Sequence, residues 1–209
     1  MEEEENADEK YDERCVDSVC HYAGFWYASW RGISDHKEPI EKQQALALEN
    51  ACKEVFAQAA SFSEQKLPDE EKTSQLLTDN GLNGNTVESY QAAYDADGAV
   101  IGYVLTVASH EGYGGDIRFT IGINSDGAVN GISLLEIGET PGLGMQAEEV
   151  LVPQYAQKNA YPLVVTKTGA QADTEIQAIS GATITSDALT NGVNAGILYF
   201  QQMLTDELN

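Results

Sequence analysis

Basic residues are scarce in the 209-residue chain: 11 Lys and Arg stand against 34 Asp and Glu, which gives a formal net charge of −23. Proteins that bind nucleic acid need clustered Lys and Arg to neutralise phosphates, so this balance excludes nucleic acid as a partner. The excess of carboxylates instead favours solubility and cationic partners. The apolar content of 42% is enough for the core of one ordinary domain with an appendage.

Cysteine is also scarce, with only Cys15, Cys20 and Cys52 in the sequence. Three cysteines at these spacings provide neither a disulfide framework nor a four-cysteine zinc or iron–sulfur site. We interpret them as packing residues. The 3 histidines are far apart and form no metal-ligand pattern, so we expect no metal site. His110, just before a glycine-rich string, either lines a ligand pocket or, as we expect, ends a strand on the surface.

Long apolar runs are missing as well, because the longest covers only residues 22–28, far short of the roughly 20 residues of a membrane-spanning helix. The acidic N-terminus also lacks a signal-peptide pattern. Apolar residues recur there every three or four positions, which predicts a helix with one buried stripe formed by Tyr11, Cys15, Val19, Tyr22 and Trp26. We therefore predict an N-terminal helical segment over residues 1–38 and a separate domain over residues 39–209.

The remaining pattern predicts an α+β fold, with an antiparallel β meander and flanking helices. Runs rich in Tyr, Val, Ile and Thr predict strands at residues 87–96, 99–109, 117–124 and 128–137. Asp-Gly pairs between these runs predict hairpin turns. Periodicity and turn residues further predict helices at 39–61 and 189–204, a loop with one helical turn at 67–85, one or two short helices at 145–157 and a strand at 162–167.

The string SGATITS, at residues 180–186, opens into the last predicted helix. Its small residues allow a backbone to approach a ligand closely, and Thr185 or Ser186 can cap the helix. The N–H groups of a first helical turn favour an anion such as phosphate. A plain helix cap is the alternative to a binding site. The candidate binding residues in this string are Ser180, Gly181, Ala182, Thr183 and Thr185.

Two further strings, GYGG at residues 112–115 and ETPGLG at residues 139–144, follow predicted strands. Tyr113 offers an aromatic face or a hydroxyl. The residue before Pro141 is restricted to extended geometry, so its loop is rigid enough to present side chains to a ligand. Taken alone, each string is also compatible with a simple turn. The candidate binding residues here are Gly112, Tyr113, Gly114, Gly115, Glu139, Thr140, Gly142 and Leu143.

In this order, the three strings resemble the FMN-binding domain of the G subunit of the Rnf electron-transport complex, and of its relative, the C subunit of the sodium-pumping quinone reductase. The likeness runs from about Lys37 to Leu204. It implies FMN esterified through its phosphate to Thr183, with the other two strings bordering the flavin. The family usually has Asp three residues before the Ser of SGAT, where this sequence has Gln177. A flavin transferase attaches FMN in this family. If that enzyme recognises the carboxylate, attachment to this chain is slower or absent, while the pocket still holds FMN.

The resemblance implies an FMN-carrying redox subunit, rather than a complete enzyme, of a membrane complex that couples electron flow between ferredoxin and NAD⁺ to ion translocation. Its implied partners are other subunits of that complex and the flavin transferase. The implied location is the cell membrane, with the flavin domain on the extracytoplasmic face, although the absence of an apolar spanning segment also permits a soluble protein. In the resembling family, a single transmembrane anchor lies at the place of residues 1–32. Three interpretations of the segment in this chain stay open: it keeps the anchor's helical place with a polar surface, it is an interfacial helix, or it is a helix packed on the domain.

Two other functions stay open: a stand-alone extracytoplasmic flavin carrier or reductase module, and a non-redox scaffold subunit that has lost the cofactor. Gln177 is the argument for the second. The sequence contains no Ser/His/Asp set, HExxH, Walker loop or GxGxxG after a strand, so no side chain is assigned to acid–base catalysis.

We expect a chain that begins near Pro39 to fold, remain soluble and carry FMN. All three strings lie at or beyond Gly112, and terminal segments tolerate removal when they share little backbone with the core. Thermal unfolding of the truncated and full-length chains tests this expectation. Aggregation of the truncated chain, or a midpoint about 10 °C lower, would mean that the aromatic residues between 22 and 30 belong to the core.

Overall fold

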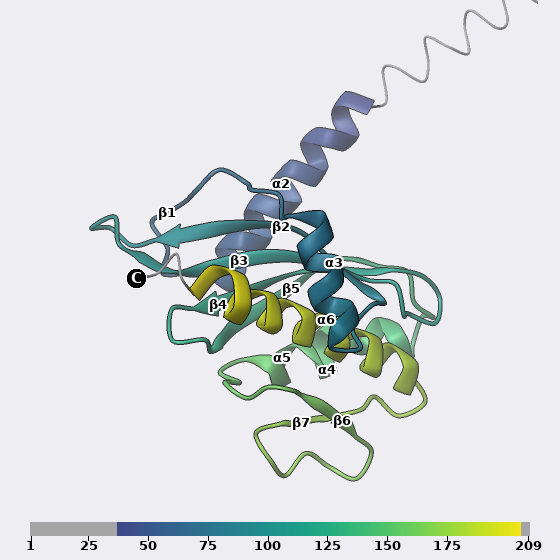
Figure 1. Ribbon diagram of the computed structural model, residues 1–209. Coiled ribbons are helices and arrows are strands. Elements are labelled where there is room, and N and C mark those ends of the chain that lie inside the picture. The colour runs from purple at the N-terminus through teal and green to yellow at the C-terminus, as the bar shows by residue number, and fades with distance from the viewer. Residues whose placement is uncertain (1–36, 206–209) are drawn as a thin grey trace, which may run out of the picture. The chain divides into compact units, whose positions relative to one another are not determined.

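The computed structural model describes residues 37–205, and the helix predicted from Tyr11 to Trp26 lies outside this range together with Cys15 and Cys20. The fold is α+β with an antiparallel meander, as predicted (Figure 1). The domain boundary at residue 38 stays a prediction. Within the described part of the chain, no helix combines the length and apolar character needed to cross a bilayer.

A five-stranded sheet in the order β1-β2-β3-β4-β5 forms the centre of the domain. Every neighbouring pair is antiparallel. The sequence predicted the four long strands to within two residues at each end and missed the short edge strand β1. The strands are β1 (Ser61–Phe62), β2 (Asn85–Tyr94), β3 (Val100–Ser109), β4 (Ile117–Asn124) and β5 (Val129–Ile137).

The hairpin turns lie where the Asp-Gly pairs predicted them. Gly98 and Gly127 have φ angles of 81° and 87°, a region that residues with a Cβ avoid. In the first turn, Asp95 Oδ1 accepts hydrogen bonds from the N–H groups of Asp97 and Ala99 at 2.9 and 2.8 Å. A local side-chain contact therefore closes this turn and sets the register of the hairpin.

Helix α6 (Thr183–Tyr199) packs across one face of the sheet and continues as a π-helical turn, η2 (Phe200–Leu204) (Figure 1). A Cβ on Gly192 would lie 2.9 Å from Phe119 Cε1, and one on Gly196 would lie 3.1 Å from Ile121 Cγ2. These glycines allow the helix to approach the sheet closely. The helix is buried on almost every side, so the single apolar stripe expected from the sequence was too narrow.

Helix α3 (Glu70–Asp79) lies where the sequence predicted a loop with one helical turn, and that prediction was wrong. Asp69 caps the helix by accepting a hydrogen bond from the Lys72 N–H at 3.1 Å. Its buried side packs on α6 through a cluster of Leu77, Leu82, Ala195 and Leu198. Most of a helix's stability comes from such tertiary packing, which the local sequence does not reveal.

The segment between β5 and α6 is built from short elements. The predicted short helices are η1 (Gly144–Gln146), α4 (Ala147–Val150) and α5 (Val152–Tyr155). Strand β6 (Val164–Thr166), also predicted, pairs in parallel with β7 (Glu175–Gln177) in a second sheet that the sequence did not predict. Because β7 ends five residues before Ala182, this small sheet determines how the chain approaches the start of α6.

The other face of the sheet holds the C-terminal residues of α2 (Lys37–Val55). The side chains of Val55 and Phe56 pack over glycines on β3, β4 and β5. A Cβ on Gly122, for example, would lie 3.0 Å from Phe56 Cδ2. Cys52 is buried in this cluster, in the packing role expected for it. Burial raises the pKa of its thiol to about 11.

We expect Phe56→Ala to lower the free energy of unfolding by about 3–5 kcal/mol, because it removes a fully buried ring and leaves a cavity. Urea unfolding followed by circular dichroism measures the change. Leu67→Ala is the control: Leu67 is 79% exposed, so its loss should change stability by no more than about 0.5 kcal/mol. Equal effects of the two substitutions would contradict the assignment of Phe56 to the cooperative core.

Candidate functional site

The first turn of α6 and two loops enclose a cleft of about 550 Å³. This volume lies within the range of roughly 300–1,000 Å³ that is typical of small-molecule and cofactor sites. All three strings singled out in the sequence contribute to it, although they are far apart along the chain. The wall is formed by Tyr113, Glu139, Thr140, Leu143, Gly144, Gly181, Ala182, Thr183, Ile184 and Thr185.

Most of the binding residues expected from the sequence lie in this wall, and five do not. Gly144 and Ile184 line the cleft although neither was among the candidates. Both lie inside the strings that pointed to the site, so the signal for them was present in the sequence. The candidates outside the wall are Ser180, Gly112, Gly114, Gly115 and Gly142.

Helix α6 begins at Thr183 without a side-chain cap, and its N-cap residue is Ala182. The prediction that Thr185 or Ser186 caps the helix was therefore wrong. The Ser186 N–H makes the first intrahelical bond, to Ala182 O at 3.1 Å. The preceding N–H groups have no intrahelical acceptor and add to the partial positive charge of the helix end. This end of α6 favours an anion.

Ser186 instead fixes the loop that leads to Thr183. Its buried Oγ accepts the Ile179 N–H at 3.0 Å and donates to Ala182 O at 2.9 Å, so one hydroxyl joins both ends of the loop. Below it, the Thr190 hydroxyl donates to Ser186 O and contacts Tyr155 OH, each at 2.8 Å. Burial raises the pKa of Tyr155, which keeps its phenol protonated.

Gly144 brings the loop after β5 against α6. A Cβ at this position would lie 2.7 Å from Glu139 Cβ and 2.8 Å from Thr185 Oγ1, both shorter than a van der Waals contact. A larger residue would push the loop away from the helix and widen or distort the cleft. The close approach therefore requires glycine.

The loop that carries Tyr113 is attached to both neighbouring parts of the site. Glu139 Oε1 accepts the Tyr113 N–H at 2.8 Å. Glu111 Oε2 accepts a hydrogen bond from Asn191 Nδ2 of α6, also at 2.8 Å. The exposed Tyr113 side chain thus extends from a loop that is held at two points, the Tyr113 N–H and the Glu111 side chain.

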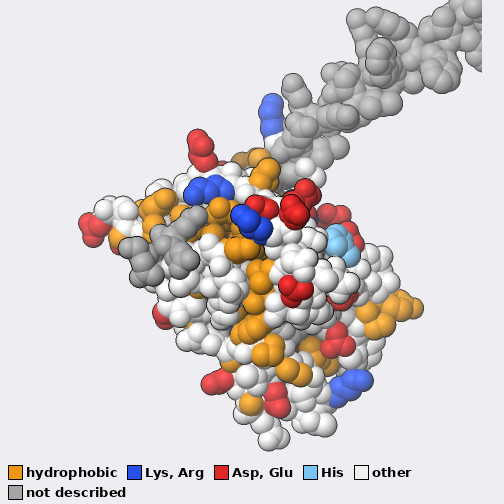
Figure 2. Space-filling model, viewed as in Figure 1, with side chains coloured by type: hydrophobic (Ala, Val, Ile, Leu, Met, Phe, Trp, Pro, Cys, Tyr) orange, Lys and Arg blue, Asp and Glu red, His pale blue; other side chains and the backbone are white. Residues whose placement is uncertain are grey.

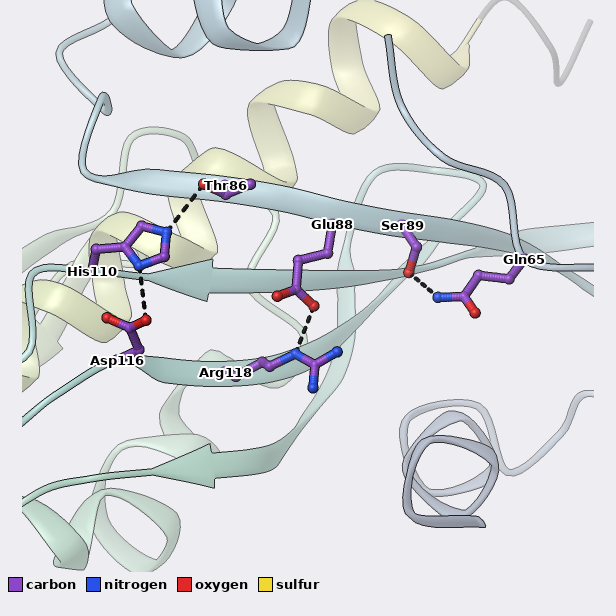
Figure 3. Close-up of polar contacts among 7 residues, drawn as sticks. All are labelled: Gln65, Thr86, Glu88, Ser89, His110, Asp116 and Arg118. Atoms are coloured by element: carbon purple, nitrogen blue, oxygen red, sulfur yellow. Dashed lines mark hydrogen bonds and ion pairs between the residues drawn. The ribbon is translucent and has the colours of Figure 1, made fainter. Parts of the chain in front are cut away.

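His110 stands at the base of the same loop and does not line the cleft; it is exposed at the end of β3, as expected. Its Nδ1 pairs with Asp116 Oδ2 at 3.0 Å and its Nε2 contacts Thr86 Oγ1 at 3.2 Å (Figure 3). Figure 3 also shows the neighbouring pair, in which Arg118 Nε donates to Glu88 Oε2 at 2.6 Å. The His110–Asp116 contact joins the two ends of the β3–β4 loop, whereas the Arg118–Glu88 pair joins β4 to β2.

Residues 112–197 match the family described as the FMN-binding domain. The G subunit of the Na⁺-translocating ferredoxin:NAD⁺ oxidoreductase complex of Acetobacterium woodii is 36% identical over 168 residues, which cover 78% of this chain and 79% of the relative. The chain belongs to the family of G subunits of ion-translocating oxidoreductase complexes. Another member of this family, from Methanosarcina acetivorans, is 33% identical over 158 residues, covering 75% of this chain and 76% of its own.

Among solved structures, NqrC of Shewanella oneidensis aligns with 74% of this chain and 73% of its own, at a TM-score of 0.47 and 17% identity. The match to the FMN-binding domain covers the cleft. Its first residue, Gly112, adjoins Tyr113, and its last residue, Ile197, lies in α6. Every residue of the cleft wall falls within the matched range.

The wall of the cleft fits FMN in two respects. Tyr113, Leu143 and Ile184 leave 72%, 42% and 53% of their surfaces exposed, and they share the cleft, so a flat ring bound there would cover apolar surface that water now contacts. The uncapped start of α6 provides the anion site that a phosphate requires. The residues present therefore suit both ends of the cofactor named by the family.

We expect Ser186→Ala to lower the free energy of unfolding by about 1–3 kcal/mol, because it leaves the buried Ile179 N–H without an acceptor. Urea unfolding measures the loss. Ser180→Ala, in the same loop but exposed, is the matched control and should change stability by no more than about 0.5 kcal/mol. Indistinguishable variants would mean that the Ser186 hydroxyl does not stabilise the loop.

Proposed function

We propose that this chain is the FMN-carrying electron-transfer subunit of a membrane ion-translocating ferredoxin:NAD oxidoreductase complex of the Rnf type, with FMN esterified through its phosphate to Thr183. One observation carries the proposal: Thr183 is the first residue of an uncapped helix and lies in the wall of the cleft. An anion-binding helix end and a hydroxyl on its first residue are the two groups that a phosphoester at this place requires.

The division of labour in the site follows from its residues. Bound FMN supplies the redox chemistry, and the protein supplies position, electrostatics and exclusion of water. The first turn of α6 holds the phosphate, and Ser186 keeps the preceding loop in place. Tyr113, Leu143 and Ile184 provide the apolar surface for the ring. No side chain needs to act as a general acid or base.

The partners and the location are proposed from the family. Its members are named as subunits of ion-translocating oxidoreductase complexes, which supports other subunits of such a complex as partners. We propose that a flavin transferase attaches the FMN and that the domain lies on the extracytoplasmic face of the cell membrane. The net charge of −23 favours partner surfaces that are basic.

Gln177 stands where the family usually has Asp. This difference favours a second candidate function, in which the same cleft holds FMN without the ester. The Gln177 side chain lies outside the cleft wall, and its Oε1 is buried without a hydrogen-bond partner. Its backbone N–H and C=O are bonded to the Gln154 side chain at 2.7 and 3.1 Å. These bonds do not depend on the side chain of residue 177, so Gln leaves the approach to α6 in place.

We expect Thr183→Ala to abolish covalent FMN while leaving the fold intact, because the ester needs that hydroxyl. Each variant is produced in cells that contain the flavin transferase, precipitated with acid and analysed by peptide mass spectrometry. Acid-stable flavin in the unaltered chain supports the ester, whereas flavin released by acid supports the non-covalent alternative.

Two variants serve as controls for this experiment. Thr183→Ser keeps a hydroxyl at the same position and should retain some adduct. Thr185→Ala removes the other threonine hydroxyl in the first turn of α6 and should keep the adduct on residue 183. An adduct on the Thr183→Ala chain, or one located on Thr185, contradicts the assignment.

A further inference from the structure

Among the residues that the structure describes, Glu139 is the one carboxylate in the wall of the cleft, and it is only 6% exposed. Carboxylates are almost never buried to this degree unless they are paired. Among residues 42–205, no Lys or Arg forms an ion pair with it. Its identified partner is the Tyr113 N–H, a neutral donor that leaves the negative charge uncompensated.

The carboxylate head lies on the Tyr113 side of the cleft. Oε1 is 2.8 Å from the Tyr113 nitrogen and would be 3.0 Å from a Cβ on Gly112. The stem packs at the opposite side, where Gly144 separates Glu139 Cβ from Thr185 Oγ1. The cleft therefore has a partial positive charge at the start of α6 and a buried negative charge toward Tyr113.

This arrangement bears on the ring more than on the phosphate. The phosphate is drawn to the helix end, which leaves the ring for the part of the cleft that Tyr113 and Glu139 share. A buried charge acts through surroundings of low dielectric constant, so its effect is stronger than that of the acidic side chains scattered over the surface in Figure 2.

We propose that the Glu139 carboxylate lowers the reduction potential of the ring bound in this cleft; this inference rests on the FMN-carrying function proposed above. Reduction by two electrons with uptake of one proton adds one negative charge to the ring. A fixed negative charge nearby opposes that gain. The electrons come from a reduced redox subunit in the complex, or from dithionite in the test, and the proton comes from water.

Glu139→Gln tests the charge separately from the geometry, because the amide oxygen of Gln can still accept the Tyr113 N–H. We expect the equilibrium constant for two-electron reduction to rise about tenfold, which corresponds to a reduction potential about 30 mV higher. Dithionite titration of the flavin-loaded chain against a redox dye, followed by flavin absorbance, measures the potential. Glu148→Gln, on the exposed surface of α4, is the matched control and should change the constant by less than twofold.

Glu139→Asp retains the charge and should stay within about twofold of the unaltered chain. If the Asp and Gln variants shift equally, geometry is responsible and the inference is wrong. Should the Gln variant not fold, Glu139→Ala supplies the neutral side chain for the same comparison. Equal potentials for the unaltered and neutral chains overturn the role of Glu139 while the FMN-carrying function stands. An unaltered chain that holds no flavin overturns both.

Discussion

Helix α6 lies against the sheet at distances that glycine makes possible, and the position of the cleft depends on this contact. Gly192 and Gly196 leave no room for a Cβ between the helix and the side chains of β4. The helix is consequently buried along most of its length, and its start is carried to the end of the sheet where the β3–β4 loop lies. Core packing and the placement of Thr183 are thus two consequences of the same contact.

The loops around the start of α6 are held by polar contacts rather than by apolar packing. Ser186 joins the ends of the preceding loop, and Glu139 joins the loop after β5 to the backbone of Tyr113. Large apolar side chains therefore stay exposed to water inside the cleft. Their exposure is unfavourable in the chain without a ligand, and it provides a binding surface for a flat ligand. The charges of the site are separated in the same way, with the helix end at one side and a buried carboxylate at the other.

Features of the fold that depend on local interactions were predictable. The meander follows from runs of the strand-favouring residues Tyr, Val, Ile and Thr and from Asp-Gly turns, whose geometry a few neighbouring residues decide. Helix α3 was missed because Leu77 is stabilised by residues of α6 more than 100 positions away. The parallel pairing of β6 with β7 was missed for a related reason, since short strands carry little signal until they are paired.

Residue types at short spacing were enough to indicate the family and the three strings that form the cleft. The sequence could not show which members of each string line the cleft, because that depends on how three distant loops meet. The tertiary structure placed Ile184 in the wall and Gly112 outside it, and it started α6 at Thr183 without a cap. It also brought the Glu139 carboxylate to the Tyr113 N–H, a contact between residues 26 positions apart that depends on how their two loops meet.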